Sequence, residues 1–167
     1  MATSRAKKGK ATFGQYGDIQ ATDPEGQALL NAFSIEVKNG YTNDSFLNMV
    51  DKLSGAAGQT WEKFVRQAKD DAKKAGALYW MLIWKRNRKT PLVFVPLAAM
   101  RSIALASRDR PFSKADFFVI PHLRGKVELK NGSHIQIYLT SLSLFLETIH
   151  PLDIQNMLVE RENEQAR

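Results

Sequence analysis

The most constraining feature of the sequence is an amphipathic segment that is followed directly by a continuous apolar run. Within Gln59–Ala75, apolar residues recur at helical spacing and form one stripe: Trp61, Phe64, Val65, Ala68, Ala72 and Ala75. Gly76 provides a helix stop, because glycine adopts the left-handed conformation that ends many helices. The next eight residues, Ala77–Trp84, are all apolar, which predicts a strand covered on both faces.

Further patterns on both sides of this unit predict an α/β (α+β) fold. Phe33–Lys38 alternates apolar with polar residues, as a half-buried strand does. Beyond the apolar run, residues 91–97 predict a returning strand and residues 98–106 predict a helix. Interleaved strands and helices of this kind build a central mixed β-sheet flanked by helices.

The two ends of the chain carry shorter signals. Asn131-Gly132 is a strong hairpin signal between predicted strands at 126–130 and 133–139. Weaker patterns predict a short strand at 16–21 and a turn at 22–26. They also predict a short strand at 117–120 and a helix at 140–149.

The length of 167 residues suits one ordinary domain. The patterns predict a flexible basic arm at residues 1–15 and a core at residues 16–112. They further predict a C-terminal hairpin-and-helix extension of the same domain at 113–158 and a disordered tail at 159–167. The sequence has no internal repeat and no long low-complexity segment.

Composition excludes several classes of function. The chain has no cysteine, which excludes disulfides, zinc–thiolate sites and thiol nucleophiles, and favours a reducing compartment. Its apolar runs are far too short to cross a bilayer, and its first residues lack the apolar core of a secretory signal. We therefore expect a cytoplasmic protein with no membrane partner. Motifs for nucleotide hydrolysis, serine hydrolysis and zinc proteolysis are missing.

The net charge of +7 is unevenly distributed. Four cations lie in the acid-free first ten residues: Arg5, Lys7, Lys8 and Lys10. Four more lie in the turn after the apolar run: Lys85, Arg86, Arg88 and Lys89. Clustered cations on a basic chain indicate a polyanionic partner, with nucleic acid as the first choice and an anionic membrane surface as the second. We expect these residues to contact phosphates of a nucleic acid, with Tyr41 stacking on a base or contacting a phosphate. The alternatives are a solvated arm, a charged turn that prevents edge pairing and, for Tyr41, an aromatic packed on the rim of the sheet.

Three charged residues form a candidate metal site. Glu36 and Lys38 share one face of their strand, because side chains alternate with period two, while Ile35 and Val37 point to the core. If the strand around Asp18 pairs antiparallel with this one, the two carboxylates converge on one cation. Two carboxylates, the Val37 carbonyl, water and a phosphate oxygen suit Mg²⁺, with Mn²⁺ as a substitute. Such a metal activates water for phosphodiester cleavage, and Lys38 would orient or deprotonate that water or hold the phosphate.

Asp18 followed by Glu36-Val37-Lys38 resembles the core motif of the PD-(D/E)xK, or restriction-endonuclease-like, nucleases. Over about residues 4–97 the chain is similar to phage-encoded members that are grouped with Holliday-junction resolvases. The segments that carry this resemblance are Arg5–Lys10, Tyr16–Ile19, Ala21–Pro24, Ile35–Tyr41, Gln59–Gln67 and Trp84–Lys89. The family usually has a helix before the motif strands, and none is predicted before Asp18.

The resemblance implies a restriction-endonuclease-like fold and Mg²⁺-dependent cleavage of DNA, branched or duplex, with Holliday junctions as the expected substrate. It also implies a homodimer that acts in DNA recombination, in the cytoplasm of the bacterial host if the chain is phage-encoded. By carry-over, Asp18 and Glu36 are metal ligands, Lys38 is the catalytic lysine, and Gln67 matches the family's helix-borne glutamine.

Two alternatives remain open at this point. Glu128-Leu-Lys130, with Asp116 upstream, is a second Glu-x-Lys pattern, but it runs into the predicted hairpin and is typical of a solvated hairpin face. The first copy precedes a helix and a buried strand, as the nuclease interpretation requires. The chain could also be a catalytically silent nuclease-fold module that binds DNA or protein, or a basic assembly protein.

Overall fold

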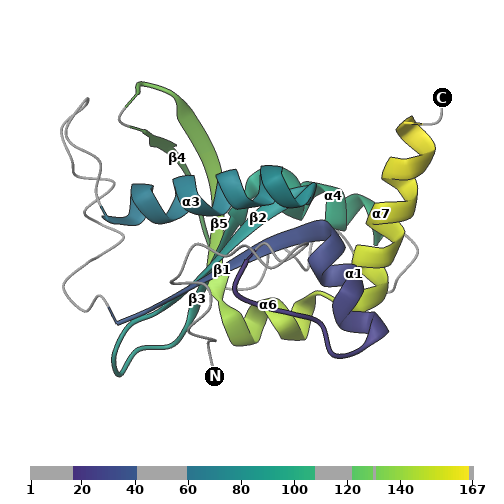
Figure 1. Cartoon of the computed structure of the whole chain (residues 1–167), viewed down its shortest axis with the longest axis horizontal. Helices are drawn as coiled ribbons and strands as arrows, with labels where there is room; N and C mark the ends of the chain where they lie inside the picture. The colour runs from purple at the N-terminus through teal and green to yellow at the C-terminus, as the bar shows by residue number, and fades with distance from the viewer. Residues whose placement is uncertain (1–16, 41–59, 108–121, 130, 166–167) are drawn as a thin grey trace.

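A computed structural model describes residues 17–40, 60–107, 122–129 and 131–165. Its helices are α1 (Pro24–Ala32), α3 (Thr60–Ala75), α4 (Leu97–Ala106), α6 (Leu142–Thr148) and α7 (Pro151–Gln165). Its strands are β1 (Phe33–Asn39), β2 (Tyr79–Lys85), β3 (Leu92–Pro96), β4 (Leu123–Glu128) and β5 (His134–Ser141). The strands form one sheet in the order β1-β2-β3-β5-β4, with helices on both faces (Figure 1). The expected mixed sheet flanked by helices is confirmed.

The sheet is mixed because only one pair of neighbouring strands is parallel. β1 and β2 run parallel, with Glu36 beside Leu82 and Lys38 beside Trp84. The other neighbours, β2 with β3, β3 with β5 and β5 with β4, are antiparallel. A parallel pair needs a crossover connection, and α3 lies within the connection from β1 to β2. Because β1 comes first in the strand order and pairs only with β2, it is an edge strand of the described sheet.

Helix α3 covers the face of the sheet that carries Glu36 and Lys38. Its predicted apolar stripe, except for the exposed Ala75 at the end of the helix, is buried against a second row of large side chains from β2 and β3: Trp80, Leu82, Trp84 and Phe94. The Phe64 and Trp84 rings meet edge to face with centroids 6.5 Å apart, a favourable aromatic geometry. Gly76 ends the helix with φ of +68°, as predicted.

The opposite face of the sheet packs on α1, α4, α6 and α7. Phe33 and Ile35 of β1 are buried there, and Val37 packs against the same core from a partly buried position. The alternation predicted for β1 is therefore confirmed, with charged residues on the α3 side and apolar residues on the other. The predicted strand at 77–84, returning strand, helix at 98–106 and hairpin around Asn131-Gly132 also form, with bounds shifted by a few residues.

The segment before β1 differs from the prediction. Residues 17 and 18 form a bend and residues 19–21 have no regular structure, so no strand forms there. The predicted turn at 22–26 instead leads into helix α1, which begins at Pro24. Asp23 caps this helix, because its Oδ1 accepts a hydrogen bond of 2.7 Å from the Gly26 amide, and Pro24 is the first helical residue. An Asp-Pro pair begins turns and helices alike, so the local signal did not distinguish them.

The C-terminal segment differs as well. α7 continues to Gln165, so residues 159–165 are helical where the sequence predicted a disordered tail. The helix packs against α1 and α4, with Ile154 and Met157 in the shared core. Within the described ranges no helix is both long and apolar enough to cross a membrane. The predicted strand at 117–120 and the basic arm at 1–15 lie outside the described residues.

Burial predicts very different stability effects for two leucines that lose the same atoms. Leu82 is 0% exposed beneath α3, whereas Leu146 on α6 is 59% exposed. We expect Leu82→Ala to lower the free energy of unfolding by about 2–5 kcal/mol, because it removes buried methyl groups and leaves a cavity. Leu146→Ala should change it by less than about 0.5 kcal/mol. Urea unfolding of both variants measures the difference, and equal effects would contradict the described packing.

Candidate active site

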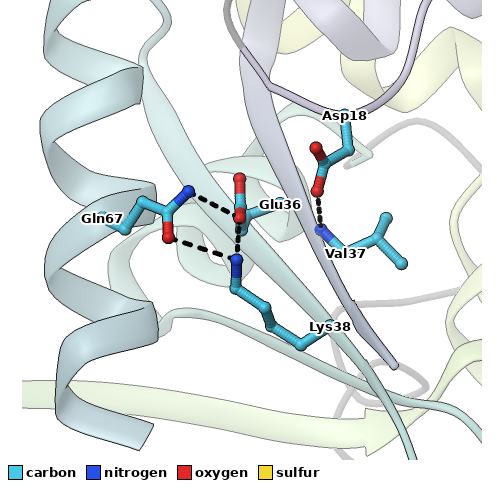
Figure 2. A network of polar contacts seen from close by, with 5 residues as sticks. All are labelled: Asp18, Glu36, Val37, Lys38 and Gln67. Carbon is cyan, nitrogen blue, oxygen red and sulfur yellow. Dashed lines mark hydrogen bonds and ion pairs between the residues drawn. The ribbon is translucent and has the colours of Figure 1, made fainter. Parts of the chain in front are cut away.

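The candidate site lies between β1 and α3, with Asp18 at the outer edge of β1 (Figure 2). Glu36 projects from β1 toward α3 and is only 4% exposed. Lys38 follows on the same face, and Gln67 reaches down from α3 to meet both side chains. The local sequence produces this arrangement, because the alternation of β1 and the stripe of α3 turn these polar residues toward each other.

Glu36, Lys38 and Gln67 form a closed hydrogen-bonded network (Figure 2). The Gln67 Nε2 donates to Glu36 Oε1 at 2.7 Å, and the Lys38 ammonium donates to Gln67 Oε1 at 3.1 Å. Lys38 also forms an ion pair with the same Glu36 Oε1. Both donors thus reach one carboxylate oxygen, and Oε2 accepts no hydrogen bond from the described residues. Glu36 is held in place while one oxygen stays available to a further ligand.

Lys38 is also held by an aromatic ring of α3. Its Nζ lies 5.2 Å from the centroid of the Phe64 ring, within the range of a cation–π interaction. Phe64 and Gln67 are three residues apart and therefore share a face of the helix. The sequence interpretation treated Phe64 only as core. Its spacing from Gln67 was the signal that could have indicated a role beside Lys38.

Asp18 is bound to the outer edge of β1, away from β2. Its backbone amide donates to the Ile35 carbonyl at 2.8 Å, and its Oδ2 accepts from the Val37 amide at 2.8 Å. In a strand the N–H and C=O of one residue point to the same side, so the Val37 carbonyl also faces this edge. The predicted antiparallel strand pair does not form, yet Asp18 reaches β1 next to Glu36 through these two hydrogen bonds.

Burial controls the electrostatics of Glu36. Removal of the carboxylate from water raises the pKa of Glu36 above its ordinary value of 4.5, and this effect outweighs the opposing hydrogen bond and charge of Lys38. The negative charges of Asp18 and Asp71 raise the pKa of Glu36 further. A cation beside Glu36 would offset this cost, which is the property expected of a carboxylate in a metal site.

The oxygen atoms at this edge fit a hard divalent cation. Asp18 and Glu36 each retain one carboxylate oxygen without a hydrogen bond from the described residues, and the Val37 carbonyl faces the same side as Asp18. Mg²⁺ is commonly held by one or two carboxylates and completes its shell with water and substrate phosphate. Across the described part of the chain, no three His, Cys, Asp or Glu residues gather as an all-protein metal cage.

The cationic turn lies at the end of the sheet where β1 ends. Asn39 is paired with Lys85, and the Gly40 amide donates to the Lys85 carbonyl at 3.0 Å. Within the turn, the Arg86 guanidinium lies 5.5 Å from the Trp84 ring centroid, so an aromatic side chain supports one of the four cations. Arg88 and Lys89 are exposed. The other predicted contacts lie outside the described residues: Arg5, Lys7, Lys8, Lys10 and Tyr41.

The second Glu-x-Lys pattern lies elsewhere. Glu128 ends β4, opposite His134 of β5, at the far edge of the sheet from β1. Lys130 and Asp116 lie outside the described residues. The first copy packs against a helix, where Glu36 and Lys38 both meet Gln67.

Comparison with known families decides the class of the protein. Residues 1–156 match the family model described as "Phage putative PDDEXK endonuclease". The chain belongs to this family. The match includes residues 113–149, where the sequence motifs gave no resemblance. Neither the curated proteins nor the solved structures compared with the chain gave a match.

Membership in this PD-(D/E)xK family agrees with the observed α+β architecture and supports a nuclease. PD-(D/E)xK nucleases generally use divalent metal ions, and the oxygen atoms of Asp18, Glu36 and Val37 suit such an ion. The family therefore gives the buried charge of Glu36 a chemical explanation.

The raised pKa of Glu36 predicts how the stability of the metal-free protein depends on pH. The folded chain binds this proton more tightly than the unfolded chain does, so ionised Glu36 lowers stability increasingly as pH rises through its folded pKa. Glu36→Gln should therefore be more stable than the wild type near pH 7. The difference should shrink as pH falls toward about 4, below the ordinary carboxyl pKa.

Urea unfolding in a chelating buffer at both pH values measures this difference. Gln67→Glu serves as a matched opposite, because it adds a carboxylate to the same network and should destabilise the protein near pH 7. A Glu36→Gln protein that is less stable than the wild type near pH 7 would contradict the dominance of burial.

Proposed function

We propose that the chain is a Mg²⁺-dependent endodeoxyribonuclease in which Asp18, Glu36 and the Val37 carbonyl hold the metal. The observation that carries this proposal is the attachment of Asp18 to β1 beside Glu36 and Lys38. These are the two carboxylates and the lysine that a PD-(D/E)xK nuclease requires, and seventeen residues separate the two carboxylates in the sequence. Mn²⁺ should substitute for Mg²⁺, because it accepts similar oxygen ligands.

The bound metal would supply a water of lowered pKa and would neutralise charge on the cleaved phosphate. Lys38 provides the positive charge next to it, where an ammonium orients or deprotonates the attacking water or binds a phosphate oxygen. Gln67 acts on the two motif residues by hydrogen bonds to both, and so keeps Lys38 at Oε1 of Glu36 while Oε2 stays free of these contacts. Phe64, which lies on the same helix as Gln67, limits the movement of the Lys38 side chain through its ring.

The cationic turn after β2 would bind the phosphates of DNA beside the site. Arg86, Arg88 and Lys89 follow the strand that is paired with β1, so phosphates bound there would continue along the backbone toward Lys38. The contact of Arg86 with the Trp84 ring reduces the entropy cost when its guanidinium binds a phosphate. We propose the same role for Lys85 and, in the N-terminal arm, for Arg5, Lys7, Lys8 and Lys10, with Tyr41 as a further DNA contact.

Branched DNA, and Holliday junctions in particular, is the proposed substrate, cut by a homodimer during recombination in the bacterial host cytoplasm. The resemblance to phage resolvases supports this part of the proposal. A cleavage panel of four-way junction, flap, linear duplex and single strand, with and without Mg²⁺, tests it directly. Preferred cutting of the junction is expected, and equal cutting of all four substrates would contradict junction specificity.

Substitution of the motif residues should strongly reduce cleavage and preserve DNA binding. Lys38→Met is expected to lower the cleavage rate by about 10²- to 10⁴-fold, the usual contribution of a proton-transfer group. Glu36→Gln should remove measurable Mg²⁺ binding, because it deletes a charged ligand. Both are measured by calorimetric titration, single-turnover cleavage and a DNA-binding assay.

Glu128→Gln is the matched control, since it makes the same change in the second Glu-x-Lys pattern. It should cut DNA at the wild-type rate. Wild-type cutting by Glu36→Gln would overturn the proposed mechanism. If the wild type bound DNA but neither bound metal nor cut, the chain would instead be a nuclease-fold binding module.

Neutralising the cationic turn should weaken DNA binding in a salt-dependent way. We expect the triple variant Arg86→Gln, Arg88→Gln, Lys89→Gln to lower the slope of log affinity against log salt by about 0.9 for each phosphate that the turn neutralises in the wild type. Lys73→Gln with Lys74→Gln is the control. These lysines lie at the C-terminal end of α3, before β2 begins, whereas the cationic turn lies at the other end of β2. Titration of labelled DNA at several salt concentrations measures both slopes. An unchanged slope in the turn variant would exclude the turn from the DNA surface.

A further inference from the structure

Gly17 makes an unusually close approach to the backbone of β1. Its φ is +91°, and a Cβ placed there would lie 2.8 Å from the Ile35 carbonyl oxygen and 3.2 Å from the Ile35 nitrogen. The obstructing atoms belong to the backbone of a sheet strand, which cannot yield as a flexible side chain does. Any residue other than glycine would therefore hold this segment away from the strand and strain its own backbone.

Two hydrogen bonds depend on this close approach. The Asp18 amide donates to the same Ile35 carbonyl, and the Val37 amide donates to the Asp18 carboxylate, both at 2.8 Å. Figure 2 shows the second contact, with the Asp18 side chain reaching toward the Val37 nitrogen. Gly17, which must lack a side chain, thus immediately precedes Asp18, which is hydrogen-bonded to β1 through its backbone amide and its carboxylate.

The other left-handed glycines of the described chain lack this crowding. Gly40, Gly76 and Gly132 have φ of +93°, +68° and +76°, yet nothing lies within 4 Å of a Cβ at any of them. At those positions only the backbone angle favours glycine. At Gly17 the angle coincides with contact against the strand that carries Glu36 and Lys38.

We propose that Gly17 is a positioning residue for metal binding, which fixes Asp18 against β1 and so sets its carboxylate beside Glu36. This inference rests on the proposed metal site. Gly17 itself contacts neither metal nor DNA and acts only through Asp18.

Four variants test this role: Gly17→Ala, Asp18→Asn, the double variant of both, and Gly132→Ala. Gly132→Ala is the matched control, because it puts a methyl group at a left-handed position in open space. Calorimetric titration with Mg²⁺ should show about 10- to 100-fold weaker affinity for Gly17→Ala, the usual effect of removing support from a metal ligand. Gly132→Ala should bind Mg²⁺ like the wild type. The double variant should bind no more weakly than Asp18→Asn alone, because both changes act on one ligand.

Hydrogen exchange supplies a readout that does not depend on metal. The Val37 amide of the wild type is bonded to Asp18, so Gly17→Ala should speed its exchange while amides in the β3–β5 pairing keep their protection. Loss of protection throughout the sheet would mean that the variant is globally destabilised, and would overturn a specific positioning role.

The remaining outcomes separate this inference from the proposed function. A wild type that binds no Mg²⁺ overturns the metal site, and the role of Gly17 in it falls as well. A wild type that binds Mg²⁺ beside a Gly17→Ala variant of equal affinity overturns the role of Gly17 alone. Additive effects in the double variant would show that the two residues act independently, and would also overturn the inference.

Discussion

The parallel pairing of β1 with β2 beneath α3 is the interaction on which the rest of the structure depends. Its register sets Glu36 beside Leu82 and Lys38 beside Trp84, which places the charged face of β1 under the polar residues of α3. The same helix buries its apolar stripe on β2 and β3. The hydrophobic contacts that stabilise the fold therefore also fix the distance from Gln67 to the two motif residues.

A buried carboxylate at this position is costly for the fold. Glu36 lies at the border of an apolar cluster, where removal from water disfavours its charge. Lys38 and Gln67 compensate for part of this cost, and both do so at a single oxygen. A network that satisfied the carboxylate completely would be more stable without metal, but it would leave no oxygen for a cation. For the proposed metal site, this arrangement would be the compromise between stability and activity that active sites commonly show.

The sequence predicted those elements whose residues themselves carry a strong periodic pattern. The stripe of α3, the apolar run of β2, the alternation of β1 and the Asn131-Gly132 hairpin all formed, because local periodicity and burial favour the same structure there. α1 was missed, since Asp23 and Pro24 favour a turn as well as a helix start. The end of α7 was missed because its residues 159–164 are exposed and continue a helix whose earlier turns pack against α1 and α4, far away in sequence. The candidate site was also predictable only in part. Spacing and resemblance pointed to the residues that the structure brings together around β1. The approach of Gly17 to Ile35 was not predictable, because it joins two segments separated by α1 and no pattern within either segment specifies it.

The attachment of Asp18 also restricts how two copies of the chain could associate. β1 is an edge strand of the described sheet, and exposed edges readily pair with strands of other molecules. Here the Ile35 carbonyl and the Val37 amide are already bonded to Asp18, so Asp18 occupies the place of a neighbouring strand. A dimer formed by strand addition along this part of β1 would displace a proposed metal ligand. Two copies that both keep an intact site must therefore associate through a different surface.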